Sequence, residues 1–529
     1  MTEYLLLVGV IIAACILLSG FAEKLPVPSL LIFIGLGMLF GENGPLGIIF
    51  NDYALSESVC TVCLVFVMFY GGFGTNMRTA RPVLARSFVL SSLGVLFTAL
   101  LVGSFVHLCL GFSWIESMII GSVISSTDAA SVFNILRSKK MALKDHTDSL
   151  LELESGSNDP MSYLLTVVTV SLATGENVSI PLLFAQQMVL GILGGILIGW
   201  GCVFLLNHLT FYMDQGRTIL VVAAAIIAYA LPSVLGGNGY LSVYFCGILM
   251  GNRYLAGKKE LVHFFDAVTG IAQMMIFFLL GLLVTPVELP EVLAPAILIM
   301  LFMTVIGRPL SVTALLLPFR SSLRQIGLVS WAGLRGVASI VFAIYVMTSQ
   351  VSMELDLFNL VFCIVILSLL FQCSLLPWMS KKLDMIDYNA DIQKTFNDYQ
   401  EESSISFIKM HIDEGNHMAH KKLKEIALPP SFLIVLVIRN GSHMVPDGNT
   451  EVLPGDLLVA AAQEFENRKN LSLYEIGIEK GHKWENRHLR ELDVGEGTLV
   501  VMIQRQEDTI IPDGNTEIQR GDTLVLAKF

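Results

Sequence analysis

The chain carries, at residues 153–160, the stretch Leu153-Glu154-Ser155-Gly156-Ser157-Asn158-Asp159-Pro160. The stretch lies inside a long apolar run, yet it holds carboxylates, hydroxyl groups and an amide within a few residues. Ionisable groups at membrane depth are costly and usually belong to an ion path. We therefore expect a cation and a proton to compete for this stretch.

Composition predicts a polytopic α-helical membrane protein. Of the 529 residues, 54% are hydrophobic and only 15% are charged. Repeated apolar runs long enough to cross a bilayer predict thirteen transmembrane helices. The spans are expected at residues 3–21, 27–42, 56–74, 83–111, 114–137, 148–174, 181–209, 217–233, 237–254, 261–285, 291–317, 323–349 and 355–380.

The charges of the connections predict the orientation. Lys and Arg occur in every second connection, from Lys24 to Lys381 and Lys382, whereas the connections between them carry acids such as Asp52. Cytoplasmic loops of membrane proteins are enriched in Lys and Arg. We therefore expect the N-terminus outside the cell and the C-terminal tail in the cytoplasm.

The composition changes near Lys382. Residues 383–529 carry 15 Lys and Arg against 25 Asp and Glu, which accounts for most of the net charge of −12. This shift predicts a polar tail behind the membrane part. The expected domains are a membrane exchanger at 1–382, a linker at 383–402 and two soluble domains at 403–469 and 470–529.

The tail contains an internal repeat. The segments Val445–Glu451 and Ile511–Glu517 are nearly identical and lie 66 residues apart. Each unit predicts a short helix, an apolar strand, a Pro-Asp-Gly turn, a Gly-Asp turn and a final strand. We expect two small α/β modules. The alternative is that they are inert folding modules, because Asp-Gly and Gly-Asp need only form turns.

Two apolar spans are interrupted by small and polar residues. One interruption, at 125–131, contains Asp128, and the other, at 331–339, contains Arg335. Secondary transporters often pair two broken helices from inverted repeats around an ion site. If the chain consists of two inverted repeats of six spans each, joined by a linking seventh span, then the fifth span corresponds to the twelfth. The alternative is that the small residues only permit close helix packing.

The residues of the opening stretch divide into two faces of a helix. Asp159 lies roughly 16 Å along its span, near mid-membrane. Ser155 and Asp159 share one face, with Asn158 beside it. Carboxylate, hydroxyl and carbonyl oxygens suit a small alkali cation, and burial disfavours the charged carboxylate, so Asp159 can instead take up a proton. A site that holds either ion couples their transport, and Asp128 could supply a second carboxylate or orient the first.

Glu154 lies nearly opposite Asp159 on the same helix, so we expect it to form a structural ion pair. An uncompensated buried charge is strongly destabilising. Two arginines, Arg308 and Arg335, fall within apolar spans. Either could pair with Glu154.

Together these residues resemble the NhaP/NHE-like branch of the monovalent cation:proton antiporters. Residues 154–160 are similar to its Asn-Asp motif, and Gly333-Leu334-Arg335-Gly336 matches its Gly-Leu-Arg-Gly segment. Thr127-Asp128-Ala129-Ala130 resembles its Thr-Asp-Pro-Val segment, with alanine in place of proline, and Arg308-Pro309 resembles the arginine of the preceding span. The resemblance covers about residues 1–380.

The resemblance implies an NhaA-like fold of thirteen helices, a homodimer in the bilayer and elevator-like alternating access. It implies that Asp159 exchanges the cation and the proton, and that Glu154 and Asn158 are tied to Arg308. The Asn-Asp form goes with electroneutral one-for-one exchange. The implied K⁺ or Na⁺ site consists of Asp159, Asp128, Ser155 and Thr127 (through its backbone carbonyl), with structural support from Asn158, Glu154, Arg308 and Arg335.

Each tail unit resembles the RCK_C module, also called TrkA C-terminal. Antiporters with such tails are bacterial, which implies the inner membrane. RCK_C modules dimerise, and in some bacterial cation transporters they bind cyclic di-AMP, so a nucleotide regulator is expected somewhere in 403–529. No Gly-x-Gly-x-x-Gly follows a strand in the tail, so the sequence gives no support for NAD or ATP sensing.

These observations favour an electroneutral K⁺ or Na⁺/H⁺ antiporter regulated by its tail. One alternative is an RCK-regulated cation channel, although the chain has no Thr-x-Gly-Tyr-Gly-like selectivity filter. A second is a transport-inactive sensor of ions or pH. The polar residues offer no nucleophile–base set and no zinc-spaced cluster. We therefore expect neither an enzyme nor a resident cofactor, and no nucleic-acid partner.

Overall fold

The computed structural model describes Gly9, Ala13, Ile16, Leu17 and residues 30–387 and 405–528, apart from short gaps. The gaps are at 43, 46, 49, 51, 76, 129–130, 133–134, 137–138, 140, 176–178, 209–214, 254, 256–257, 350, 415, 417, 427, 429–431, 440–441, 464–471, 479–481, 493–497, 506–507, 511 and 513. Most of the predicted first span, most of the predicted linker and the predicted boundary between the tail modules lie outside the described residues. The chain divides into two compact units, Met1–Gln400 and Glu401–Phe529.

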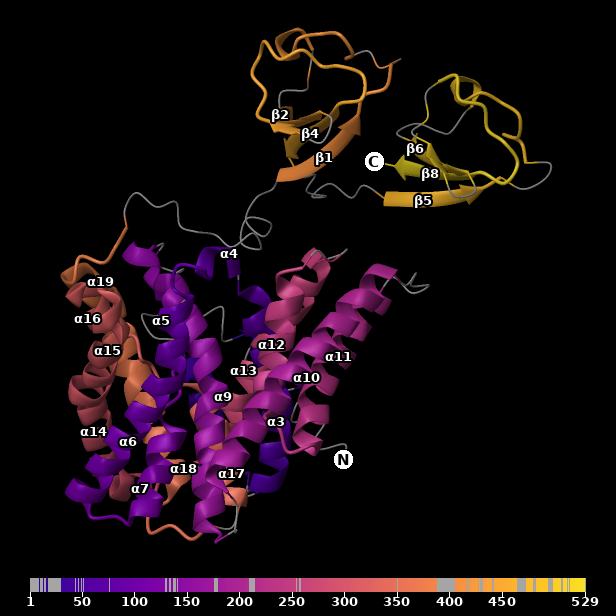
Figure 1. Cartoon of the computed structure of the whole chain (residues 1–529). Helices are drawn as coiled ribbons and strands as arrows, with labels where there is room; N and C mark the ends of the chain where they lie inside the picture. The colour runs from indigo at the N-terminus through magenta and orange to yellow at the C-terminus, as the bar shows by residue number, and fades with distance from the viewer. Residues whose placement is uncertain are drawn as a thin grey trace. The chain divides into compact units, whose positions relative to one another are not determined.

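The first unit is helical, and its helices lie side by side in a bundle (Figure 1). Each predicted span from 27–42 onward coincides with one helix or with a run of helical segments. The helices are α2 (Leu30–Phe40), α3 (Tyr53–Gly74), α4 (Met77–Ala80), α5 (Leu84–Val89), α6 (Val95–Phe105), α7 (Trp114–Val123), α9 (Thr147–Ala173), α10 (Ile180–His208), α11 (Gly216–Val234), α12 (Gly239–Gly251), α13 (Lys258–Leu283), α14 (Leu289–Phe302), α15 (Arg308–Leu316), α16 (Leu323–Trp331), α17 (Val337–Thr348), α18 (Leu357–Leu367) and α19 (Ser374–Lys382).

Within the described residues, 7 helices are long and apolar enough to cross a membrane. The segment Trp114–Val123 is apolar but shorter, because it stops at the first interruption. The helix α9 is long but carries Asp148, Glu152, Glu154 and Asp159, so its composition falls short of that of an ordinary span. The count of thirteen spans and the inverted repeats stay predictions.

Both predicted interruptions are present. The helix α7 ends at Val123, and the backbone from Ser126 to Asp128 is not helical. In the twelfth predicted span, α16 ends at Trp331 and α17 begins at Val337. The two non-helical segments are joined where the Asp128 N–H donates to the Leu334 carbonyl at 2.8 Å. The two interruptions therefore meet in space.

Two neighbouring helix runs contain π-helical segments close to these interruptions. Met303–Gly307 joins α14 to α15, and Ser368–Cys373 joins α18 to α19. Such segments are uncommon and often occur at functional sites, because the extra residue changes the direction of the side chains that follow. Here the first segment directly precedes Arg308.

The second unit contains two antiparallel sheets, in the orders β1-β4-β2-β3 and β5-β8-β6-β7. Both central pairings shift register at equivalent positions, between Ile434 and Leu436 and between Val500 and Met502. The predicted repeat is therefore a repeat of structure. The strands are β1 (Ile405–His411), β2 (Phe432–Arg439), β3 (Ser442–Met444), β4 (Leu457–Gln463), β5 (Ser472–Gly477), β6 (Thr498–Arg505), β7 (Asp508–Ile510) and β8 (Thr523–Lys528).

The modules differ from the prediction at their starts. Each begins with a strand, β1 or β5, that pairs with the last strand of its module. The predicted short helix is a 3₁₀ turn at Leu423–Glu425 and again at Leu489–Glu491, and the described parts of the second unit contain no α-helix. Such short segments cannot offset the unfavourable nucleation of an α-helix.

Candidate functional site

The helix α9 presents the central residues of the site to the first interruption. The Ser155 hydroxyl donates to the Thr127 carbonyl at 2.7 Å. The Asn158 amide donates to the Thr127 hydroxyl at 2.5 Å, and the Thr127 N–H approaches the Asn158 Oδ1 at 3.4 Å. Asn158 and Thr127 are both buried. The amide thus fastens the non-helical segment to α9 without adding charge.

Asp159 contacts the same segment one residue earlier. The Ser126 hydroxyl donates to the Asp159 Oδ1. Asp128 lies close enough to interact electrostatically with Asp159, and its own carboxylate accepts the Ser131 hydroxyl at 2.5 Å. Asp159 and Asp128 are both partly exposed, whereas Ser126 is buried. Two carboxylates, hydroxyl groups and a backbone carbonyl therefore converge at the interruption.

Ser126 was not among the residues predicted for the site. The sequence signal was the run of hydroxyl residues before Asp128. In a non-helical segment, however, the direction of each side chain depends on tertiary contacts and cannot be read from the periodicity of a helix or strand. The neighbouring Ser125 hydroxyl points elsewhere, to the Ser122 carbonyl at 2.7 Å and the Ser162 hydroxyl at 3.2 Å.

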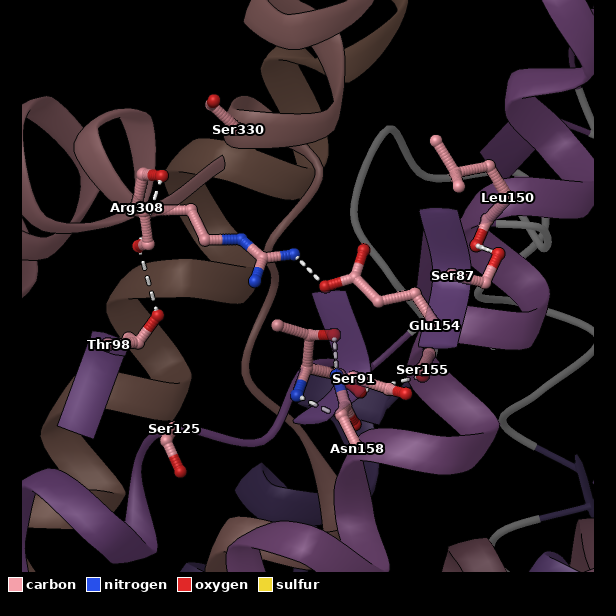
Figure 2. A network of polar contacts seen from close by, with 12 residues as sticks. Ser87, Ser91, Thr98, Ser125, Leu150, Glu154, Ser155, Asn158, Arg308 and Ser330 are labelled. Atoms are coloured by element: carbon pink, nitrogen blue, oxygen red, sulfur yellow. Dashed lines mark hydrogen bonds and ion pairs between the residues drawn. The ribbon is translucent and has the colours of Figure 1, made fainter. Parts of the chain in front are cut away.

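Glu154 faces away from this group and pairs with Arg308 (Figure 2). Their side chains are 1% and 2% exposed. Gly333 makes room for the guanidinium, because a Cβ there would lie 2.8 Å from the Arg308 Nε. The structure thus selects Arg308 rather than Arg335 as the partner of Glu154. Asn158, which was expected beside Arg308, bonds to Thr127 instead.

Arg335 has a different task. Its guanidinium donates to the Ser125 carbonyl at 2.9 Å and to the Ser126 carbonyl, and its Nη2 lies 3.0 Å from the Met303 sulfur. Its backbone N–H donates to the Ser368 hydroxyl at 3.0 Å. Carbonyls beyond a helix C-terminus carry partial negative charge. The fully buried Arg335 therefore compensates the open end of α7 and fixes the backbone that carries Ser126.

The second interruption also shapes the Asp128 side. A Cβ at Gly336 would lie 2.4 Å from the Asp128 Oδ2, so only glycine leaves room for the carboxylate. On the other side of the site, Pro160 cannot donate a helix hydrogen bond. Its carbonyl accepts the Asn238 amide at 2.8 Å, which ties α9 to α12. All eight predicted site and support residues therefore lie at or beside the meeting point of α9 and the two interruptions.

The arrangement suits reversible binding of one small cation. Hydroxyl, carbonyl and carboxylate oxygens are hard ligands. The Thr127 carbonyl and both carboxylates here accept a hydrogen bond from a serine hydroxyl that can rotate away. The Ser155 and Ser126 hydroxyls are rotors, since the position of a hydroxyl hydrogen adapts to its partner. A cation can therefore replace internal hydrogen bonds without unfolding the site.

Two family models match the chain. A family model described as the transmembrane part of sodium/hydrogen exchangers matches residues 10–382. A TrkA-C domain model matches twice, at residues 409–464 and 473–527. Both models correspond to the resemblances that the sequence motifs carry.

Two curated relatives cover most of the chain. The K(+)/H(+) antiporter NhaP2 of Shewanella baltica strain OS223 is 32% identical over 470 residues, covering 87% of this chain and 81% of the relative. The K(+)/H(+) antiporter NhaP of Alkalimonas amylolytica is 32% identical over 452 residues, covering 84% and 78%. These relatives are transporters and not enzymes, in agreement with the sequence-based expectation.

A solved structure has the same fold. The sodium proton antiporter MjNhaP1 of Methanocaldococcus jannaschii at pH 8 superimposes with a TM-score of 0.66 at 21% identity. The match covers 72% of this chain and 99% of that chain. At this identity the likeness concerns the fold of the membrane unit alone.

Proposed function

The chain belongs to the sodium/hydrogen exchanger family, and we propose that it is an electroneutral antiporter that exchanges K⁺ or Na⁺ for H⁺ across a bacterial inner membrane. The observation that carries the proposal is the placement of Asp159. Its carboxylate lies at the interruption, in contact with Ser126 and near Asp128. The names of the curated relatives favour K⁺ as the cation.

The exchange rests on one carboxylate with two partners. A proton or an alkali cation can neutralise Asp159, but both cannot occupy it together, so each displaces the other. The Thr127 carbonyl, the Ser155 hydroxyl and Asp128 complete the cation site, and we add the Ser126 hydroxyl to it. On cation binding, the Ser155 hydroxyl turns from the Thr127 carbonyl and directs its lone pairs to the ion.

Electroneutrality requires that Asp159 alone changes its occupant, while the other charges of the site, including that of Asp128, stay constant through the cycle. Asn158 supplies an amide where a second exchangeable carboxylate would add a charge, and Glu154 is neutralised by Arg308. One cation then replaces one proton in each cycle. Alternating access moves the site between the two sides with Asp159 neutralised by a cation or a proton, because an empty Asp159 carboxylate would be costly to expose to the bilayer interior.

The remaining proposals concern assembly and control. We propose a homodimer with the N-terminus outside and the tail modules in the cytoplasm. The TrkA-C modules regulate exchange by binding a small ligand, for which a nucleotide second messenger such as cyclic di-AMP is the candidate.

Transport in proteoliposomes tests the function. A pulse of K⁺, Na⁺ or Li⁺ should dissipate a preset pH gradient, recorded with a pH-sensitive dye, and an imposed membrane potential should leave the rate unchanged. Asp159→Asn should abolish exchange, whereas Asp266→Asn, an exposed acid on α13, serves as the matched control. Ser126→Ala should raise the cation KM about tenfold, and Ser125→Ala should leave it unchanged. Exchange by Asp159→Asn at the wild-type rate, or single-channel currents from the wild type, would refute the proposal.

A further inference from the structure

Residues 383–387, which we call the strap, follow α19 and pair with the loop before α9. The Lys144 N–H donates to the Met385 carbonyl at 2.9 Å, and the Asp387 N–H donates to the Ala142 carbonyl at 2.9 Å. Leu143 and Ile386 face each other in an antiparallel bridge. Although the composition predicted that the linker starts at residue 383, these residues are bonded to the membrane unit.

The strap is held by burial as well as by backbone hydrogen bonds. Met385 is 1% exposed, and Leu143 and Ile386 are each 5% exposed. Apolar side chains removed from water stabilise a contact far more than exposed ion pairs do. The strap is therefore a packed element of the membrane unit.

Asp384 connects the strap to two other segments. Its carboxylate accepts the Lys144 Nζ at 3.0 Å and the Arg324 Nη1 at 2.8 Å. Asp384 itself has a φ of 52°, a left-handed conformation that is unfavourable for a residue with a Cβ. These exposed ion pairs orient the strap on the loop and on α16.

The loop at 141–147 connects the segment after the first interruption to α9. Two consecutive residues in it, Asp145 and His146, have φ of 59° and 53°. Left-handed residues other than glycine persist only where the surroundings fix them. Here the Gln325 amide donates to the Asp145 carbonyl at 3.2 Å and to the Thr147 hydroxyl at 3.1 Å.

The strap thus contacts the cytoplasmic connections of the elements that form the site. The loop leads from the Asp128 segment to α9, which carries Asp159. Arg324 and Gln325 lie in the first turn of α16, which leads into the interruption that carries Arg335. The strap is therefore connected along the chain to both sides of the site, within a few turns of helix.

We propose that the strap is the joint through which the tail modules control the ion site. The proposal rests on the proposed antiport function and adds its route of regulation. The strap has two states, paired with residues 142–144 or released. The paired state holds Asp145 and His146 in their left-handed conformations and keeps the first turn of α9 in register with the site. The modules are covalently continuous with Asp387, so their ligand-dependent changes shift the balance between the two states.

A reversible cross-link tests the proposal. The two substitutions Leu143→Cys and Ile386→Cys replace the pair of residues that face each other in the bridge. The hydrogen bonds of this bridge are made by the residues on either side of the pair, and in such a pair the Cα atoms lie about 4.5 Å apart. This separation accommodates a disulfide. The full-length variant carries Cys109→Ser, to remove an exposed thiol, and a protease site inserted between residues 388 and 404. Exchange is measured in proteoliposomes before and after cleavage, oxidised and then reduced.

In the reduced protein, cleavage should change the exchange rate about fivefold or more, since the modules no longer act on the strap. In the oxidised protein the strap is locked in its paired state, and cleavage should have no effect. Reduction of the same sample restores sensitivity and shows that the pair of cysteines has not damaged the fold. Each single cysteine variant serves as a control for the loss of the larger side chain.

A second variant releases the strap without cross-linking. Ile386→Asp places a charge in a buried position and should raise the cation KM about fivefold or more, whereas Ile386→Val should preserve the wild-type KM. Equal effects of cleavage in the oxidised and reduced states, or no effect of cleavage in either, would overturn the strap as the joint while exchange itself persists. Absence of exchange in the wild type would instead overturn the proposed function.

Discussion

Arginine–carboxylate pairs occur in both units of the molecule, and they differ in how completely they are bonded. In the first tail module, the Arg439 guanidinium donates to both oxygens of Asp456, at 2.8 and 2.7 Å, and to the Glu451 carbonyl at 2.8 Å. In the membrane unit, Arg308 reaches Glu154 through Nη2 alone, and its Nε and Nη1 have no partner among the described residues.

The two pairs also differ in how far their side chains are exposed to solvent. The Arg439 side chain is 29% exposed and Asp456 is 1% exposed, so the arginine is accessible to solvent. Both partners of the membrane pair are almost fully buried. We call the pair of Arg439 and Asp456 the clasp. It fixes a turn, because Asp456 also accepts the Leu453 N–H at 2.8 Å. The membrane pair is kept because neither charge can remain alone.

The second module repeats the clasp with the same geometry. Arg505 donates to Asp522 at 2.8 and 2.7 Å and to the Glu517 carbonyl at 2.8 Å. A pair that recurs with its distances in two copies is determined by the local sequence. The pair of Arg308 and Glu154 joins residues 154 positions apart and depends on the packing of the whole bundle.

The largest effect is expected from removing one partner of the membrane pair. Arg308→Met leaves Glu154 buried and unpaired, and should destabilise the membrane unit by about 3–5 kcal/mol. Glu154→Gln should be similarly damaging, whereas the double variant should regain most of the stability. The apparent Tm of the purified proteins in detergent measures this. A double variant no more stable than either single variant would show that the charges do not compensate each other.

A smaller effect is expected from the clasp of each module. Arg439→Met and Arg505→Met each remove hydrogen bonds from a buried carboxylate that also accepts a backbone N–H, so each should cost about 1–3 kcal/mol. The loss should be local and alike in the two modules. Hydrogen exchange of the full-length chain, followed at residues 453–456 and 519–522, measures it. Unequal losses of local stability in the two modules would contradict the equivalence of their arginine–aspartate pairs.

The smallest effect is expected from pH. The hydrogen bond from Arg439 holds the pKa of the Asp456 carboxyl below its ordinary value. A lowered pKa means that the clasp contributes fully above the unfolded pKa of about 3.9. Its contribution is lost only as pH falls through the lower folded pKa. Hydrogen exchange at residues 453–456, corrected for the intrinsic pH dependence, should therefore be unchanged between neutral and mildly acidic pH; loosening near neutrality would contradict the clasp.

The sequence predicted a helical membrane unit because apolar runs are local signals, while the count of thirteen spans and the orientation stay predictions. It also predicted where α7 and α16 end, since small and polar residues interrupt an apolar run at both places. It left Arg308 and Arg335 open as partners of Glu154, because pairing between distant spans depends on packing. Asn158 was expected beside Arg308, and its hydrogen bonds are with Thr127.

The remaining differences have local causes. Ser126 could not be distinguished from Ser125, since the direction of each hydroxyl is set by Arg335, which fixes the backbone carbonyls of both. The strap was assigned to a linker, because the charge changes near Lys382 while the bonding partners of the strap lie in a distant loop. The opening strands β1 and β5 were missed, since each is recognised only by its pairing with the final strand of its module.

Proton release on cation binding tests the central claim most directly. The claim is that Asp159 holds either a proton or a cation. When K⁺, and in parallel Na⁺, is added to purified protein in weakly buffered solution over a series of pH values, the wild type should release about one proton per chain where the site is protonated. Asp159→Asn should release none, and Asp266→Asn should behave as the wild type. Cation binding without proton release in the wild type, or equal release from Asp159→Asn, would contradict the account.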